Sequence, residues 1–231
     1  MEKKIILGVT GGIAAYKSVD IASGLKSCGC AVKVVMTKNA TRFVNPRCFI
    51  VPTFWDMWIR ESAFADNLDN HIEIALWADA FVVSPATANV VGKFANGIAD
   101  DLLSTIHLAL PDRVEKIMYP AMNTRMFNHP AVQRNLKTLR FRGWNIQCPD
   151  TGKLACGETG IGKLPKPRKI VRDVCSFIDE SLSPMGKSMF RKPLPGESLT
   201  SFIEDELARI PGDVSAQRHI QEPYFHNTGE G

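Results

Sequence analysis

Short apolar runs recur along the chain and predict buried strands. The most apolar of them, residues 80–83, has no polar position, so it is expected to be covered on both faces. Further strands are expected at residues 4–9, 31–36, 114–119 and 144–148. Helices are predicted between them, one ending near residue 28, one beginning after residue 87, and others over residues 71–79, 102–110, 130–139 and 168–182. This alternation predicts an α/β fold, a Rossmann-like doubly wound parallel sheet.

The turn after residues 80–83 is rich in hydroxyl-bearing and small side chains. Pro85 cannot donate to a sheet ladder, so the strand is expected to end before it. Thr87 or Asn89 can cap the helix that follows, because the first backbone N–H groups of a helix have no internal partner. A turn of this kind, leading from a strand into a helix N-terminus, can bind a phosphate. The alternative is an ordinary strand-to-helix connection.

A second turn, with Gly11 and Gly12, follows the first strand. A P-loop would need a glycine at Tyr16, directly before Lys17. A dinucleotide-binding turn would need a G-x-G-x-x-G spacing and an acidic residue at the end of the second strand, where Thr37 stands. A hydroxyl followed by a lysine at that strand end suits a mononucleotide phosphate better. The alternative is a glycine turn that only permits close packing of helix and strand.

Two polar side chains are candidates for acid–base chemistry or substrate binding. His71 stands in the first turn of an expected helix, where it can act as a general acid or base, or simply cap or pack. Asn123 follows the strand at residues 114–119, so it is expected at the edge of the sheet where open α/β proteins bind ligands. Its amide suits a carboxylate or amide substrate, and its alternative role is to cap the next helix.

Residues 152–164 contain four glycines and several charges, with no helical or strand periodicity. This composition predicts a mobile flap that closes over a substrate. Cys156 lies in the middle of the flap, so its thiol is expected to be accessible. The chain has six cysteines but no C-x-x-C pair, and no zinc site or other metal site is expected.

Composition and charge exclude several classes of protein. The chain is 45% hydrophobic and 23% charged, which is typical of a soluble globular protein. A net charge of +4, with no long run of lysine or arginine, gives no indication of nucleic-acid binding. No stretch approaches the ~20 apolar residues of a membrane helix, and no signal peptide is evident, so a cytoplasmic location without membrane attachment is expected.

The chain is expected to form one domain followed by a tail. Residues 1–182 carry the strands and helices, whereas residues 183–231 are rich in proline and small polar residues. Five apolar residues in the tail have helical spacing and predict a short docking helix: Leu199, Phe202, Ile203, Leu207 and Ile210.

Six motifs occur in the order typical of one protein family. They are GGIAAYK at 11–17, His71 with WAD at 77–79, PATAN at 85–89, ANGIAD at 95–100, PAMN at 120–123 and LACG at 154–157. On these motifs, residues 4–180 resemble the homo-oligomeric flavin-containing cysteine decarboxylases. The resemblance implies a Rossmann-like flavoprotein with FMN at its subunit contacts, assembled as a homotrimer or as a dodecamer of trimers.

The resemblance also implies roles for particular residues. The FMN site would consist of Gly11, Gly12, Thr37, Ser84, Ala86, Thr87 and Asn89. The catalytic residues would be His71 as base, Asn123 as the group that grips the substrate carboxylate, and Cys156 as proton donor. Met122, Ala155 and Gly157 would contact the substrate together with Asn123.

The branch of the family that the motifs resemble most acts in coenzyme A biosynthesis. Its reaction converts 4′-phosphopantothenoylcysteine to 4′-phosphopantetheine and CO2. Loss of CO2 beside an unactivated carbon would leave an unstabilised carbanion, so an electron sink is needed. Oxidation of the cysteine thiol to a thioaldehyde by FMN provides that sink, and the resulting enethiolate is then protonated and reduced.

The sequence departs from the family at residues 163 and 164, among other differences, and leaves alternatives open. Lys163 and Leu164 stand where the family usually has arginine and methionine, and a lysine lacks the bidentate contacts of an arginine. One alternative is a lantibiotic-type decarboxylase of peptide C-terminal cysteines, and a flavin prenyltransferase of related fold is another. A third is a non-catalytic protein that regulates phosphatases. The flap around Cys156 and the GGIAAYK turn favour the coenzyme A branch.

Overall fold

The structure is a computed structural model of the 231-residue chain and describes residues 2–49 and 70–180. The predicted tail, residues 183–231, and its expected docking helix lie outside the described residues. Within the two described ranges, no helix is both long and apolar enough to cross a membrane. All six cysteines are free thiols, and Cys156 is exposed, as its place in a glycine-rich segment predicts.

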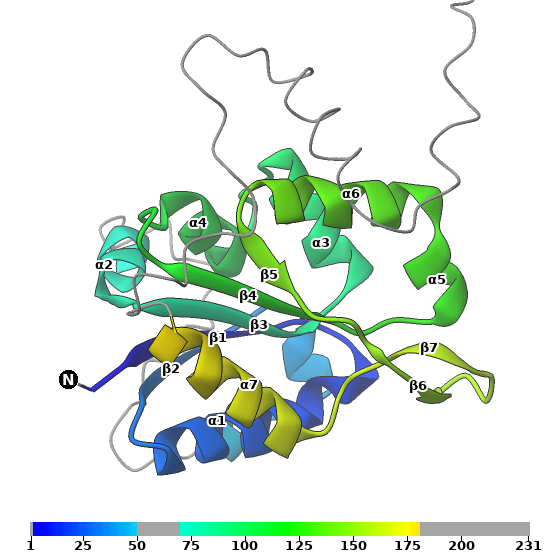
Figure 1. Ribbon diagram of the computed structural model, residues 1–231, viewed down its shortest axis with the longest axis horizontal. Helices are drawn as coiled ribbons and strands as arrows, with labels where there is room; N and C mark the ends of the chain where they lie inside the picture. The colour runs from blue at the N-terminus through cyan, green and yellow to red at the C-terminus, as the bar shows by residue number, and fades with distance from the viewer. Residues whose placement is uncertain (1, 50–69, 181–231) are drawn as a thin grey trace, which may run out of the picture. The chain divides into compact units, whose positions relative to one another are not determined.

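Five parallel strands form the central sheet, in the order β2-β1-β3-β4-β5 (Figure 1). The strands are β1 (Lys4–Val9), β2 (Ala31–Met36), β3 (Ala80–Ala86), β4 (Glu115–Pro120) and β5 (Trp144–Ile146). Strand order reverses at β1, because β2 lies on one side of it and β3 on the other. The predicted α/β class and doubly wound parallel sheet are therefore confirmed.

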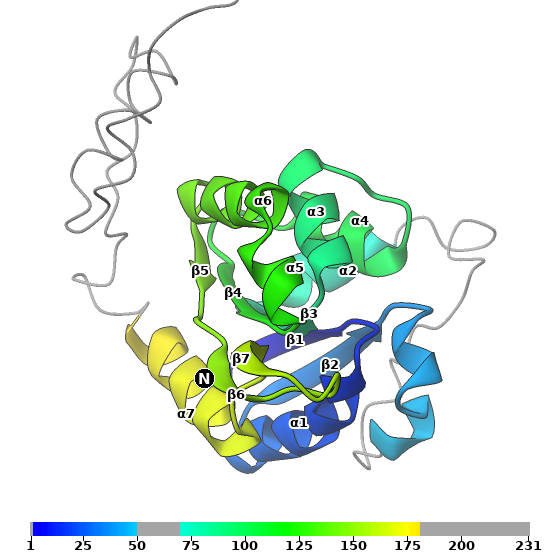
Figure 2. The ribbon, with the colours of Figure 1, turned by 90° about the vertical axis from the view of Figure 1, so that its right-hand side faces the viewer.

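Helices cover both faces of the sheet (Figures 1 and 2). One face carries α1 (Lys17–Ser27) and α7 (Pro167–Glu180), which pack against each other. The opposite face carries α2 (Asn70–Trp77), α3 (Ala88–Asn96), α4 (Leu102–Ala109) and α6 (Pro130–Phe141). Shorter helical segments are η1 (Ile13–Tyr16), η2 (Ala40–Arg42), η3 (Pro46–Phe49) and α5 (Thr124–Asn128).

The residues of β1 alternate between two hydrophobic cores. Ile5 and Leu7 belong to the core under α1 and α7, whereas Ile6 belongs to the core under the other helices. Successive side chains of a strand point to opposite faces, so a continuous apolar run is what a sheet covered on both faces requires. The burial of both faces explains why these strands could be recognised as short apolar runs.

Strand β3 extends further than the sequence predicts. It continues through Pro85 to Ala86, which pairs with Pro120 of β4, so the expectation that the chain turns before Pro85 is wrong. The pairing register shifts between Val83 and Ala86, which places the proline at an irregularity where its missing N–H breaks no regular ladder. Ser84 and Ala86 are consequently fully buried strand residues and not members of an open turn.

The predicted flap is an antiparallel hairpin of β6 (Asp150–Lys153) and β7 (Thr159–Lys163). Figure 2 looks onto the carboxyl ends of the central strands and shows the hairpin at that edge. Gly162 has a φ of 135°, and a Cβ on it would overlap the carbonyl oxygen of Met122. The Met122 N–H donates to the Gly162 carbonyl (3.0 Å), and the Thr124 hydroxyl donates to the Ile161 carbonyl (2.7 Å). The hairpin is thus bound closely to the segment that follows β4.

Candidate active site

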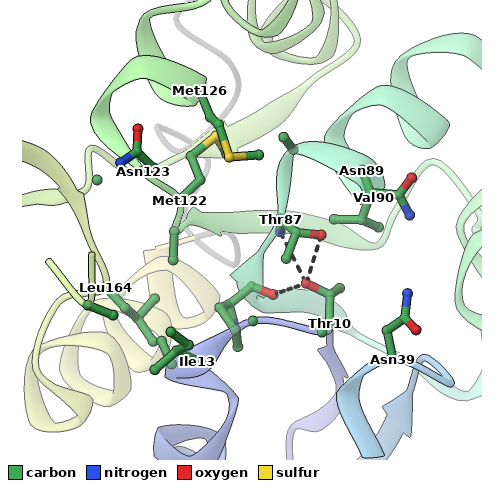
Figure 3. Close-up of a pocket in the computed structure, with 18 of the residues that line it drawn as sticks. Thr10, Ile13, Asn39, Thr87, Asn89, Val90, Met122, Asn123, Met126 and Leu164 are labelled. Carbon is green, nitrogen blue, oxygen red and sulfur yellow. Dashed lines mark hydrogen bonds between the residues drawn. The ribbon is translucent and has the colours of Figure 1, made fainter. Parts of the chain in front are cut away.

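A pocket of about 790 Å³ opens at the carboxyl ends of the central strands. Residues that follow β1, β2, β3 and β4 line it, and the β6–β7 hairpin closes one side. Figure 3 shows Thr10 and Thr87 on one side of the pocket and Met122, Asn123 and Met126 on another. Ligands of open α/β sheets bind at this edge, next to the point where strand order reverses.

Thr10, Pro85 and Thr87 form the pocket floor, in which the end of β1 is tied to the end of β3. The Thr10 hydroxyl donates to the carbonyl oxygen of Pro85 (2.7 Å) and accepts from the N–H of Thr87 (3.1 Å). Beneath it, the Ser18 hydroxyl donates to the Ser84 carbonyl (2.8 Å). Sequence reasoning did not identify Thr10 as a site residue. The sequence feature that could have identified Thr10 is a hydroxyl-bearing residue directly after a buried strand and directly before two glycines.

The N-terminus of α3 faces the pocket. Thr87 occupies the N-cap position with extended backbone (φ −78°, ψ 160°), but its hydroxyl makes no capping hydrogen bond. The expectation that Thr87 acts as a side-chain cap is therefore wrong, because its hydroxyl lies against Thr10 instead (3.3 Å). The first-turn N–H groups, including that of Asn89, have no partner within the helix and can donate to a bound anion.

Cationic side chains line the same pocket. Lys17 lies beneath the hairpin, where its ammonium donates to the Leu164 carbonyl (3.4 Å). Burial lowers the pKa of Lys17, Lys163 lowers it further, and Asp150 partly opposes both. Lys163 is thus close enough for its charge to act on Lys17, and the two lysines together provide positive potential for a phosphate or carboxylate.

Lys93 connects α3 to the loop that precedes α4. Its ammonium contacts Asp100 (2.6 Å) and Asp101 (2.7 Å), and its side chain is only 16% exposed. Burial disfavours the charge of Lys93, but the hydrogen bonds that it donates to these two carboxylates outweigh burial and raise its pKa. Asp101 also accepts from the N–H of Ser104 in a capping box at the start of α4. This ion-paired group holds the loop in place along the pocket wall.

Four polar residues form a rim cluster between the β4–α5 connection and the hairpin: Asn123, Arg125, Cys156 and Glu158. The Asn123 amide nitrogen donates to the Cys156 sulfur (3.2 Å) and to a Glu158 carboxylate oxygen (3.4 Å). The other Glu158 oxygen accepts from Arg125 (3.0 Å). The Asn123 side-chain oxygen accepts from the N–H of Arg125 (2.8 Å) and so caps α5. Asn123 therefore acts as a helix cap and presents its amide N–H groups to the thiol.

The structure brings together most of the residues assigned to the FMN site and the substrate site. Residues from both sets that line the pocket are Gly11, Gly12, Thr37, Thr87, Asn89, Met122, Asn123, Ala155 and Cys156. Ser84 and Ala86 are fully buried and do not line it, since both are interior residues of β3. Gly157 also lies outside the lining, at the hairpin turn, with a φ of 89°.

His71 does not line this pocket. It is a half-buried residue in the first turn of α2, and α2 packs against α4, away from the hairpin. Two apolar residues of the same helix, Ile72 and Leu76, are 45% and 55% exposed. Within one copy of the chain, His71 is therefore not brought together with Asn123 and Cys156.

Comparison with known proteins gives a consistent result. The sequence pattern of the Flavoprotein family matches residues 1–179. The coenzyme A biosynthesis bifunctional protein CoaBC of Bacillus subtilis (strain 168) is 41% identical over 191 residues, which are 79% of this chain and 45% of that protein. A structure of a PPC decarboxylase mutant complexed with pantothenoylaminoethenethiol superposes with a TM-score of 0.72 at 29% identity, covering 78% of this chain and 100% of the other.

A second solved structure, the epidermin biosynthesis protein EpiD from Staphylococcus aureus, has a TM-score of 0.62 at 27% identity and covers 74% of this chain and 99% of the other. The chain spans less than half the length of the bifunctional relative. The family match, in contrast, extends over all five central strands, the pocket and the hairpin. The chain belongs to the Flavoprotein family.

Proposed function

We propose that this chain is an FMN-dependent decarboxylase that converts 4′-phosphopantothenoylcysteine to 4′-phosphopantetheine in coenzyme A biosynthesis. The single observation that carries the proposal is the contact between the Asn123 amide and the Cys156 thiol (3.2 Å) at the pocket rim. It joins a carboxylate-binding group to a proton donor at the mouth of a pocket. The similarity to CoaBC and to PPC decarboxylase supports the same reaction.

The pocket residues fit FMN. A phosphate would be held by the open N–H groups of α3 beside Thr87 and Asn89, and the hydroxyl of Thr37 would serve the sugar alcohol chain. A Cβ on Gly12 would be in ordinary contact with Thr87, at 3.5 Å, so a glycine here leaves the pocket beside Thr87 unfilled. Ser84 and Ala86 would support the floor from within β3 without touching the cofactor.

When bound, FMN would supply the two-electron acceptor that takes a hydride from the substrate cysteine and returns it after CO2 has left. The chain's own residues then bind and orient the substrate. Asn123 would hold the carboxylate, and the Cys156 thiol would keep a proton ready for the carbon that has lost CO2. The hairpin, through Ala155, and Leu164 directly after it both line the pocket and would exclude water from the reaction.

We further propose a homotrimer, or a dodecamer of trimers, in which His71 acts in the pocket of a neighbouring copy. His71 lies outside the pocket of its own chain, although the resemblance gives it a catalytic role. The exposed Ile72 and Leu76 on the same helix support an interface at this surface. Free thiols at all six cysteines are consistent with the proposed cytoplasmic location.

A decarboxylase of peptide C-terminal cysteines is the second candidate. The similarity to EpiD favours it, because EpiD is a peptidyl-cysteine decarboxylase and its fold covers about three quarters of this chain. The two candidates share the carboxylate and thiol chemistry of the rim cluster and differ in what precedes the cysteine. The cationic pair Lys17 and Lys163 favours a phosphorylated substrate over an uncharged peptide.

The test is a turnover assay of the FMN-loaded protein with 4′-phosphopantothenoylcysteine and with a peptide that ends in cysteine, following CO2 release and the flavin spectrum together. We expect CO2 only from the phosphorylated compound. Cys156→Ser should reduce turnover by about 10²- to 10⁴-fold, the range for loss of a positioned proton donor, while flavin content is retained. Release of CO2 from the peptide alone would favour the second candidate, and a colourless protein that takes up no FMN would overturn both.

A further inference from the structure

The rim cluster already contains a bound carboxylate, that of Glu158. One of its oxygens accepts from the Arg125 guanidinium at 3.0 Å, and the other accepts from the Asn123 amide at 3.4 Å. The second oxygen also lies 4.0 Å from the Cys156 sulfur. A guanidinium and an amide thus hold both oxygens of one carboxylate beside the proposed proton donor.

The two donors are fixed to different degrees. Asn123 is oriented by its cap of α5, because its oxygen accepts from the Arg125 N–H at 2.8 Å and its nitrogen must point to the hairpin. Arg125 belongs to the same short helix, but its side chain is 85% exposed, and that of Glu158 is 47% exposed. Ion pairs this exposed contribute little, ~0–1 kcal/mol, because water and salt compete with them. Asn123 is therefore held in place, whereas the ion pair between Arg125 and Glu158 is easily exchanged for another carboxylate.

We propose that Arg125 is a second binding residue for the substrate carboxylate, and that Glu158 is a resident carboxylate which the substrate displaces. This inference rests on the proposed function. A substrate carboxylate that replaces Glu158 would receive one hydrogen bond from Asn123 and one from Arg125. The carbon that bears it would then lie beside the Cys156 sulfur, which is where the proton is needed once CO2 has left.

The experiment compares two non-reacting ligands in the FMN-loaded protein. One is the serine analogue of the substrate, in which a hydroxyl replaces the thiol, and the other is the same compound without its carboxylate. Their dissociation constants are measured by titration calorimetry for the wild type and for Arg125→Gln and Glu158→Gln. KM and kcat for the true substrate are measured in parallel.

Arg125→Gln should weaken binding of the carboxylate ligand about fivefold, and Glu158→Gln should tighten it about two- to threefold, in keeping with the ~1 kcal/mol scale of exposed charge pairs. The ligand without a carboxylate should bind all three proteins equally, and KM should change more than kcat. Matched controls are Arg134→Gln and Glu2→Gln, which remove exposed charges that have no contact with the rim cluster.

Equal changes for both ligands, or no change for either, would overturn the inference and leave Glu158 as a surface partner of Arg125. The proposed function is tested separately, by CO2 release from the wild type. A protein that prefers the carboxylate ligand but releases no CO2 would retain this inference and refute the proposed function.

Discussion

The pocket floor and the rim cluster are built from the same kinds of polar group but in opposite ways. On the floor, a buried hydroxyl joins two strand ends through backbone atoms, with Thr10 only 1% exposed. At the rim, side chains bind to side chains, and Arg125 and Glu158 are largely open to solvent. Buried hydrogen bonds to the backbone are costly to break, whereas exposed side-chain pairs exchange readily. The floor therefore fixes the shape of the pocket, and the rim can rearrange around a ligand.

The largest effect should come from breaking the floor with Thr10→Val, which keeps the shape of the side chain and removes its hydroxyl. The Thr87 N–H and the Pro85 carbonyl would then lose a buried partner, at about 2–5 kcal/mol for the two groups. We expect Tm to fall by roughly 5–15 °C and flavin content to fall with it, measured by calorimetry and absorbance.

The control for the floor is Thr138→Val on α6, whose hydroxyl donates to the exposed Arg134 carbonyl at 3.1 Å. This change should move Tm by less than about 2 °C, because surface substitutions have small effects. Equal losses for the two variants would show that the Thr10 hydroxyl has no special part in the fold.

Acid should weaken the packing of α4 against α3, the helix that begins at the pocket floor. His107 of α4 stacks on Phe94 of α3 with ring centroids 4.1 Å apart, and its Nδ1 is buried without a partner among the described residues. Burial, with lesser effects of Lys116 and Arg142, lowers the pKa of His107 from 6.5 to about 4. Between these values the unfolded chain binds a proton that the native chain does not, so stability is complete above pH 6.5 and falls as pH decreases towards 4.

The loss should reach at most about 3 kcal/mol, since each pKa unit corresponds to ~1.36 kcal/mol. Urea unfolding at pH 7.5 and at pH 5 would measure it. His107→Phe keeps an aromatic ring in the stack and should flatten this pH dependence, whereas His71→Gln, outside the stack, should leave it unchanged. A His107→Phe protein that loses stability in acid as steeply as the wild type would contradict the assignment.

A substitution that disturbs the rim cluster should lower activity more than it lowers stability. In Gly162→Ala the new methyl group would overlap the Met122 carbonyl and force the hairpin away from Asn123. A displacement of about 1 Å can reduce turnover ~10²-fold, while the strain at a positive φ costs only ~1–3 kcal/mol. We expect kcat to fall at least about tenfold while Tm falls less than in Thr10→Val. Gly152→Ala in the same hairpin is the control, because its methyl group would meet only the flexible Lys163 side chain.

Most of the fold could be predicted because the strands are continuous apolar runs that are covered on both faces. The end of β3 could not, because the rule that proline stops a ladder does not anticipate an irregularity that accommodates Pro85. The pocket floor could likewise be predicted only in part. Turn residues such as Gly11 and Thr87 are visible as motifs, whereas Thr10 matters only through contacts with residues more than seventy positions away.

The rim shows where local sequence reasoning ends. Asn123 and Cys156 could be identified, because each lies in a distinct setting, after a strand and within a glycine-rich segment. Glu158 and Arg125 could not, since a charged residue in a surface turn is usually only solvated, and their pairing depends on how the hairpin lies on α5. His71 could be identified as a candidate catalytic residue. The sequence does not indicate whether it would act in the pocket of its own chain or in that of a neighbouring copy.

The cap that Asn123 makes for α5 also sets the polarity of the site. A free carboxamide can either donate or accept a hydrogen bond at a given position, because rotation by half a turn exchanges its accepting oxygen for its donating nitrogen. Here the oxygen is committed to the N–H of Arg125, so only hydrogen atoms face the hairpin. When the five-residue helix α5 forms, its cap orients the Asn123 amide so that this end of the pocket binds ligands with lone pairs. The chemical selectivity of the rim therefore follows from the fold of the backbone.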